Sequence, residues 1–186
     1  MFWNNKQGWF GQQLKKNIQA LEEGDYSRIP WIFCVLVEQH IESKLIAAQA
    51  LAHVLENLGY DDIVSIDGQM RQTTSMEWSI DWHKKSIEDF FSAKMSVAER
   101  RAIIIFASFN PNGFIRQKAV IMMKDYDNTL PFIILRQNDW VIQVRQTASK
   151  TFNEKMKKLY KGELLLALPY AEKLKWCSRG SHGEYT

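Results

Sequence analysis

Apolar residues recur at steps of three and four along much of the chain, which is the spacing of one face of an α-helix. Residues 9–23 carry such a series, and Gly24 follows it as a helix stop. A later series runs through residues 141–156 and includes Val144 and Ala148. This pattern predicts an all-α protein of about eight helices.

The helical pattern is repeated along the sequence. Residues 30–58 align without a gap on residues 131–159, and residues 102–130 align on that last copy as well. In each copy an apolar segment is followed by a polar break and then by a second apolar series, so each copy is predicted to form a helix, a tight turn and a helix. A unit of this length is too small to bury its own apolar face, and copies therefore stack and share one core.

These repeats predict one domain over residues 1–186. Its expected parts are an N-terminal cap helix over 1–29, a repeat over 30–59, a degenerate unit with an irregular insertion over 60–101, repeats over 102–130 and 131–159, and a partial repeat or C-terminal cap over 160–186. Residues 163–174 resemble the first helix of a further repeat. We therefore expect the chain to be the front portion of a longer repeat protein, with an unpaired cap helix as the alternative.

The degenerate unit departs from the helical pattern at residues 60–75. Asp67 and Gly68 fit a hairpin turn there, and a plain loop is the alternative. The segment 77–91 is predicted to be helical, with Trp82 among its inward-facing aromatic residues.

Two capping-box patterns mark expected helix starts in the same region. Thr74 precedes Glu77 by three residues, and Ser96 precedes Glu99 by three residues. In such a box the first side chain and the last side chain each accept a hydrogen bond from the other residue's backbone N–H. The patterns predict helices that begin near residues 75 and 97.

A polar pair also recurs, in which an acid or amide in the turn stands six residues before a cation in the second helix. The pairs are Glu38 with Lys44, Asn110 with Arg116, and Asp139 with Arg145. Such a pair can form a ladder from one repeat to the next. Arginine suits this role because its planar fork can make two hydrogen bonds at once.

The turn acid Asp139, followed by Arg145 and then by the small residue Ala148, resembles the HEAT repeat. The resemblance covers residues 30–58 and 102–159 well. It implies a right-handed α-α superhelix, or solenoid, of HEAT-like antiparallel helix pairs. Proteins of this kind are used mostly as protein-binding scaffolds, and more rarely to bind nucleic acid or to catalyse a reaction.

Charge is unevenly distributed. Residues 1–100 carry 10 Lys and Arg against 14 Asp and Glu, whereas residues 101–186 carry 14 against 7. The basic excess lies on and just after the second helix of the last repeat, at Lys150, Lys155, Lys157, Lys158 and Lys161. It is either a solvated helix face or a surface for an anionic partner, such as an acidic peptide or a phosphate backbone. The sequence pI of about 8.8 is low for a dedicated nucleic-acid binder.

We therefore expect a non-catalytic scaffold that binds another protein through the concave inner face formed by its second helices. The candidate binding residues are Gln117, Gln146, Lys150, Lys157 and Lys158. The two glutamines share one register, and they can instead face the next repeat. The expected partner is a protein with an acidic surface, with nucleic acid as the second choice, and the chain itself is expected to be a monomer without a cofactor.

An enzymatic alternative comes from a fainter resemblance to the helical-repeat DNA alkylation-repair glycosylases. Trp78, Asp81 and Arg116 would be the matching catalytic positions. In that family the Asp stabilises positive charge that develops at the sugar, and aromatic faces contact the cationic base. The family's spacing places its Asp at the position that Trp82 occupies here, and Arg116 already has a structural explanation in the repeat ladder.

Other classes of function find little support. The four histidines form no metal-binding or catalytic motif. No stretch approaches the roughly 18 uninterrupted apolar residues of a membrane span, and the N-terminus lacks the order of charges and apolar residues found in a secretion signal. Cys34 and Cys177 lie far apart, and Cys34 is expected to be buried. We expect a cytoplasmic protein.

Overall fold

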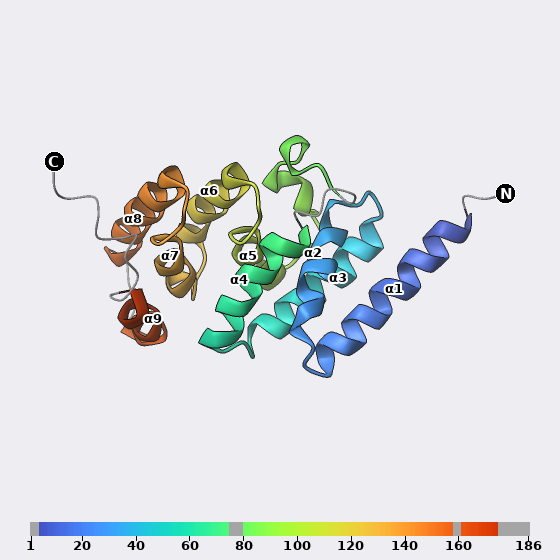
Figure 1. The fold of residues 1–186 in the computed structure, drawn as a ribbon, viewed down its shortest axis with the longest axis horizontal. Helices are drawn as coiled ribbons and strands as arrows, with labels where there is room; N and C mark the ends of the chain where they lie inside the picture. Colours follow the sequence, from blue (N-terminus) through green and yellow to red (C-terminus); the bar gives the residue numbers. More distant parts are fainter. Residues whose placement is uncertain (1–3, 75–79, 158–160, 175–186) are drawn as a thin grey trace. The chain divides into compact units, whose positions relative to one another are not determined.

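The computed structural model describes residues 4–74, 80–157 and 161–174 of the chain. Each element of these residues is an α-helix or a short 3-10 helix (Figure 1). The α-helices are α1 (Asn4–Glu22), α2 (Ile29–Cys34), α3 (Ile41–Leu55), α4 (Tyr60–Thr74), α5 (Val97–Ala107), α6 (Gly113–Met122), α7 (Leu130–Arg136), α8 (Ile142–Met156) and α9 (Lys161–Leu174). The 3-10 helices are η1 (Tyr26–Arg28), η2 (Val35–Val37), η3 (Trp82–Lys84), η4 (Ile87–Phe90) and η5 (Met123–Asp125). The predicted all-α class is confirmed for the described residues.

The chain forms two compact units, which divide inside α5. Unit 1 comprises residues 1–103 and contains the helix pair α2 and α3 of the first predicted repeat. Unit 2 comprises residues 104–186 and contains α6, α7 and α8 of the later repeats. The right-handed superhelix and the single-domain boundaries stay predictions.

The predicted helix boundaries at Gly24 and Ser96 are confirmed. The α1 helix ends at Glu22, and Gly24 has a φ of 94°, a left-handed conformation that suits glycine. The α5 helix begins after Ser96, whose hydroxyl accepts from the backbone N–H of Glu99 at 3.2 Å, while the Glu99 carboxylate accepts from the Ser96 N–H at 2.7 Å. Both hydrogen bonds of the predicted capping box are therefore formed.

Neither the hairpin nor the plain loop predicted for residues 60–75 is present, because residues 60–74 form the helix α4. Ile63, Ile66 and Met70 follow one face of this helix and are buried against unit 1. Their steps of three and four are a helical period. Burial of this apolar face outweighs the local turn preference of the sequence.

The residues that suggested a turn have other roles in α4. Asp67 accepts two hydrogen bonds from Arg71, each 2.9 Å long, one helical turn further on. Gly68 lies between them in the helix with open space around it. The helix start is secured by Asp62, whose carboxylate accepts from the Gly59 N–H at 3.0 Å.

The continuous helix predicted over residues 77–91 is also wrong within the part of it that the structure describes, residues 80–91. Two short 3-10 helices, η3 and η4, are found instead. Asp81 accepts from the backbone N–H of His83, and Ser86 and Asp89 form a capping box that starts η4. These local side-chain hydrogen bonds start two separate turns and so compete with one longer helix. The helix start predicted near residue 75 lies outside the described residues.

Within residues 80–91, two aromatic residues face the core of unit 1, and Trp82 is one of them, as predicted. Trp82 and Phe90 are buried, and both pack on Phe33 of α2. The ring centroids of Phe33 and Phe90 are 5.2 Å apart in an edge-to-face arrangement. This cluster joins the irregular segment to the first helix pair.

In unit 2, α6 packs beside α8, and α7 packs against both α8 and α9. Ala119 of α6 and Ala148 of α8 share the predicted register and are fully buried, so the backbones can approach closely. The α9 helix packs against α7, and its residues Ala167 and Tyr170 are buried. The centroid of the Tyr170 ring lies 6.4 Å from that of Phe132 in α7. The α9 helix continues over the positions at which the two preceding repeats turn.

Candidate binding surface

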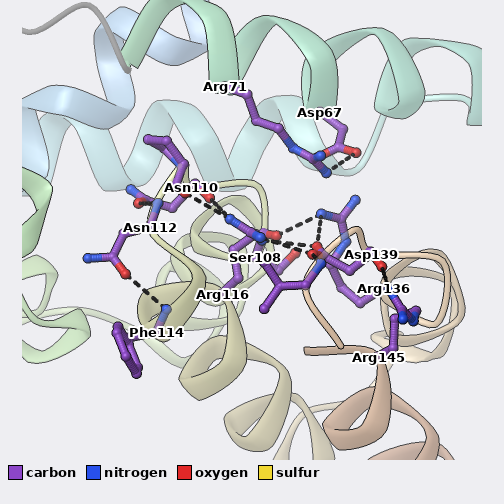
Figure 2. A network of polar contacts seen from close by, with 12 residues as sticks. Asp67, Arg71, Ser108, Asn110, Asn112, Phe114, Arg116, Arg136, Asp139 and Arg145 are labelled. Atoms are coloured by element: carbon purple, nitrogen blue, oxygen red, sulfur yellow. Dashed lines mark hydrogen bonds and ion pairs between the residues drawn. The ribbon is translucent and has the colours of Figure 1, made fainter. Parts of the chain in front are cut away.

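A buried ion pair connects the two repeats of unit 2 (Figure 2). Arg116 of α6 donates from Nε and Nη2 to the two carboxylate oxygens of Asp139, each at 2.9 Å, and both side chains are fully buried. Nη1 of the same arginine donates to the carbonyl oxygens of Asn110 at 2.8 Å and Pro111 at 2.9 Å. The guanidinium group is thus held on both sides, which satisfies a charge that would otherwise be costly to bury.

Asp139 receives further donors. Arg136 donates from Nη1 at 3.2 Å, and the backbone N–H of Val141 donates to Oδ1 at 2.9 Å. Burial disfavours the charged form of Asp139, but the Arg116 hydrogen bond, the Arg136 charge and the Val141 N–H together hold its pKa below the ordinary value of 3.8. This carboxylate therefore stays ionised in the interior.

The predicted polar pairs are formed in unit 2, although through a different acceptor from the one expected. Arg116 and Arg145 each donate Nη1 to the backbone carbonyl of the residue six positions earlier, Asn110 at 2.8 Å and Asp139 at 2.7 Å. The side chains of Asn110 and Asp139 accept instead from a backbone N–H two residues later. The link from one repeat to the next is the Arg116–Asp139 ion pair.

The same pair is not formed in the first repeat. Glu38 is exposed, and Lys44 donates from Nζ to the backbone carbonyl of Asp89 at 2.6 Å. Partial burial lowers the pKa of Lys44. The lysine therefore ties α3 to the irregular segment of unit 1.

Large apolar side chains are exposed where α6 and α8 begin. Phe114 is 81% exposed, Trp140 58% and Ile142 51%. Figure 2 shows Phe114 pointing away from the buried polar network. The Trp140 ring covers the Arg116 guanidinium, with 5.3 Å between the ring centroid and Cζ. We refer to Phe114, Trp140 and Ile142 as the aromatic edge.

The aromatic edge was not predicted from the sequence. Trp140 lies in the polar break of the last repeat, directly after the turn acid. An aromatic residue in a polar turn is a signal that could have indicated an exposed aromatic side chain there. Phe114 is the second residue of α6, where an apolar residue looks like part of the core. Only the packing of α6 against α8 shows that this side chain remains outside.

The predicted binding residues have different environments. Lys150 and Lys157 are exposed on α8 or at its end, and Gln146 of α8 is exposed as well. Gln117 is half-buried and donates from Nε2 to Thr147 Oγ1 at 2.9 Å. This glutamine therefore faces the neighbouring repeat, which was the alternative prediction for it.

Not every lysine of the predicted basic run is exposed. Lys155 is buried, and its Nζ donates to the Tyr126 carbonyl at 2.5 Å, so this lysine is a packing residue. Lys158 lies outside the described residues. The exposed cations of α8 are accordingly fewer than the sequence suggested.

The residues of the glycosylase alternative are engaged elsewhere or lie outside the described part. Trp78 falls outside the described residues. Asp81 is exposed in unit 1 and pairs with Lys84 at 3.1 Å, and the hydrogen bond from Lys84 lowers its pKa. Arg116 has no exposed surface in unit 2 and is occupied by Asp139.

Unit 1 has a groove of its own between α1, α3 and the start of α5, with a volume of about 820 Å³. Its lining includes the acidic residues Glu22 and Glu99, the imidazole of His53 and the apolar side chains of Ile18 and Ile46. The Glu99 carboxylate is already used in the capping box of α5. The groove depends on how α1 packs against α3, which the repeat pattern does not specify.

Comparison of the chain with protein-family models, with curated proteins and with solved structures gives no match. Among the described residues, His, Cys, Asp and Glu side chains form no group able to hold a metal ion. None of the described helices is long and apolar enough to cross a membrane. Cys34 is a free thiol, and burial raises its pKa to about 12.

Proposed function

We propose that the chain is a non-catalytic protein-binding scaffold, and that unit 2 holds an acidic, partly apolar segment of its partner. The aromatic edge is the observation that carries this proposal. Phe114, Trp140 and Ile142 lie at the starts of adjacent second helices, and all three are more than half exposed. The exposed amines of Lys150 and Lys157 lie further along α8.

Exposed aromatic residues of this kind suit a protein interface better than open solvent. Phe and Trp are enriched at the centres of interfaces because they bury much apolar area with few side-chain rotations. Full burial of one such side chain contributes about 1.5–3 kcal/mol. The lysines add charge that attracts an acidic partner and orients it during approach.

Nucleic acid is the second candidate, because residues 101–186 have a clear excess of Lys and Arg. Two of the arginines in that excess, Arg116 and Arg136, are buried against Asp139, and Lys155 is buried as well. Phosphate contacts need exposed cations. The described surface of unit 2 therefore favours an acidic protein over a nucleic acid.

The test is selection of peptides from a random phage-displayed library on the immobilised chain, followed by fluorescence-anisotropy titration of the selected peptides. We expect them to combine Asp or Glu with bulky apolar residues. Phe114→Ser should weaken their binding by about tenfold or more, which is about 1.4 kcal/mol. The matched control is Val97→Ser in unit 1, which removes another strongly exposed apolar side chain and should leave binding unchanged.

Two results would contradict the proposal. One is selection of no peptide above background. The other is equal binding of the selected peptides to Phe114→Ser, Val97→Ser and the unchanged chain.

A short duplex DNA is titrated in parallel at low and physiological salt. Salt-sensitive duplex binding that survives Phe114→Ser would transfer the assignment to nucleic acid.

A further inference from the structure

Arg145 repeats the position of Arg116 one repeat later, 29 residues along the chain. Each arginine donates Nη1 to the carbonyl oxygen six residues earlier, at 2.8 Å for Arg116 and 2.7 Å for Arg145. Each is therefore anchored in the same way to the turn of its own repeat.

The other side of Arg116 is filled by the following repeat. Nε and Nη2 both donate to Asp139, which lies 23 residues further on, and the ring of the next residue, Trp140, covers the guanidinium. An acidic residue followed directly by an aromatic one thus provides a carboxylate for the two donors and a ring for the planar face. Arginine is well suited to both contacts.

The residues at the same distances from Arg145 are Leu168 and Pro169, which offer neither a carboxylate nor an aromatic ring. Both belong to α9, which stays helical where the preceding repeat turns, and Leu168 is 50% exposed. Within the described part of the chain, Arg145 donates to Asp139 O alone. Its side chain is half-buried, so the fork is held in place but keeps contact with solvent.

We propose that Arg145 is the receptor for an acidic residue of the partner protein, and that an aromatic residue directly follows this acid in the partner's sequence. The partner would supply to Arg145 what Asp139 and Trp140 supply to Arg116. This inference rests on the proposed function and names the chemistry of the segment that is bound. The Nη1 bond fixes the guanidinium in advance, so less conformational entropy is lost when the carboxylate binds.

The experiment uses the full chain labelled with ¹⁵N and observes the Nε–Hε resonances of its arginines by NMR. The probe is a short synthetic peptide, blocked at both ends, with Asp-Trp at its centre. Control peptides carry Asn-Trp and Asp-Ala. The Arg145 resonance is assigned by its loss in Arg145→Lys, and the Arg116 resonance is the internal control because that site is already filled.

We expect the Asp-Trp peptide to shift the Arg145 resonance saturably at millimolar concentration and to leave the Arg116 resonance in place. Replacement of Asp by Asn should weaken binding by about tenfold, since the neutral amide lacks the charge and one acceptor. Arg145→Lys keeps the positive charge but loses the fork, and it should remove most of the difference between the Asp and Asn peptides. The helical circular dichroism of Arg145→Lys should be unchanged.

Equal shifts with the Asp and Asn peptides, or no shift of the Arg145 resonance, would overturn the inference. The proposed function is judged separately. Peptides selected from the library that lose affinity for Phe114→Ser but bind Arg145→Lys normally would support the scaffold and exclude this role of Arg145. If the selected peptides bound Phe114→Ser and Arg145→Lys as well as they bind the unchanged chain, both proposals would be contradicted.

Discussion

Asp139 balances two buried guanidinium groups with a single carboxylate. Removal of one partner from a buried ion pair leaves an uncompensated charge and costs about 3–5 kcal/mol. We therefore expect Asp139→Asn to lower the free energy of unfolding by that amount in urea denaturation. Arg145→Lys is the control. Because Arg145 is half-buried, this variant should change the free energy of unfolding by less than about 1 kcal/mol. Similar losses in the two variants would contradict this assignment.

The same carboxylate should contribute to acid sensitivity. The pKa of Asp139 is lowered in the folded chain, so its contribution to stability is present above the unfolded-state pKa and is lost as the pH falls through the folded-state pKa. The unfolded-state value is about 3.9. The difference in unfolding free energy between the unchanged chain and Asp139→Asn should therefore be constant near neutral pH and shrink below about pH 4. Urea titrations across this range measure it, and a difference that stays constant in acid would contradict the prediction.

At the scale of elements, replacement of Gly68 and of Gly24 by alanine should change the free energy of unfolding in opposite directions. Gly68 lies inside α4 with open space where an alanine methyl group would be placed, whereas Gly24 has a φ of 94° after α1. Gly68→Ala should raise the free energy of unfolding by about 0.5–1 kcal/mol, because alanine has the higher helix propensity. Gly24→Ala should lower it by about 1 kcal/mol. If thermal denaturation showed that Gly68→Ala destabilises the chain, the hairpin interpretation of this segment would regain support.

The helices that could be predicted from the sequence are those whose local and long-range preferences agree. The α1 end at Gly24 and the α5 start at Ser96 have capping residues where the apolar period stops or begins, and the buried register of Ala119 and Ala148 follows from the repeat. Such agreement makes a prediction dependable.

The elements that could not be predicted are those in which two preferences conflict. In α4 the turn preference of Asp67 and Gly68 competes with a helical apolar face, and burial of the face decides the outcome. In residues 80–91 the conflict has the opposite result, because Asp81 and Ser86 start separate short turns. The sequence contains both preferences but not their relative free energies, which depend on packing partners far away along the chain.

At the scale of the whole molecule, the repeats predicted the charge ladder but not the surface. The fixed spacing pairs Arg116 with Asn110, whose backbone carbonyl it does contact, but it did not show that Arg116 binds the carboxylate of Asp139 in the next turn. The exposure of Phe114 and the burial of Lys155 have no such periodic signature. Both follow from how α6, α8 and η5 pack. As a result, Lys155 is not part of an exposed basic face, and the side chains of the aromatic edge are exposed.

Charge reversal tests the role of the two exposed lysines on α8 and at its end. Lys150 and Lys157 are exposed, and residues 101–186 have a net positive charge, so reversal of both charges by Lys150→Glu and Lys157→Glu should repel an acidic peptide. The matched control is Lys94→Glu, which reverses an exposed lysine in unit 1. Affinity of a library-selected acidic peptide should fall by about tenfold at low salt. The loss should be smaller at physiological salt, where the screening length is about 8 Å.

The salt dependence separates two roles for these lysines. Exposed charges that only attract the peptide from a distance act mainly on the association rate, and salt weakens their effect. Charges that contact the bound peptide act on the dissociation rate and are less sensitive to salt. Stopped-flow measurement of both rates at two salt concentrations therefore tests the assignment of Lys150 and Lys157 to attraction and of the aromatic edge to contact. Unchanged rates in the double variant at low salt would show that α8 is a solvated face and confine the binding surface to the helix starts.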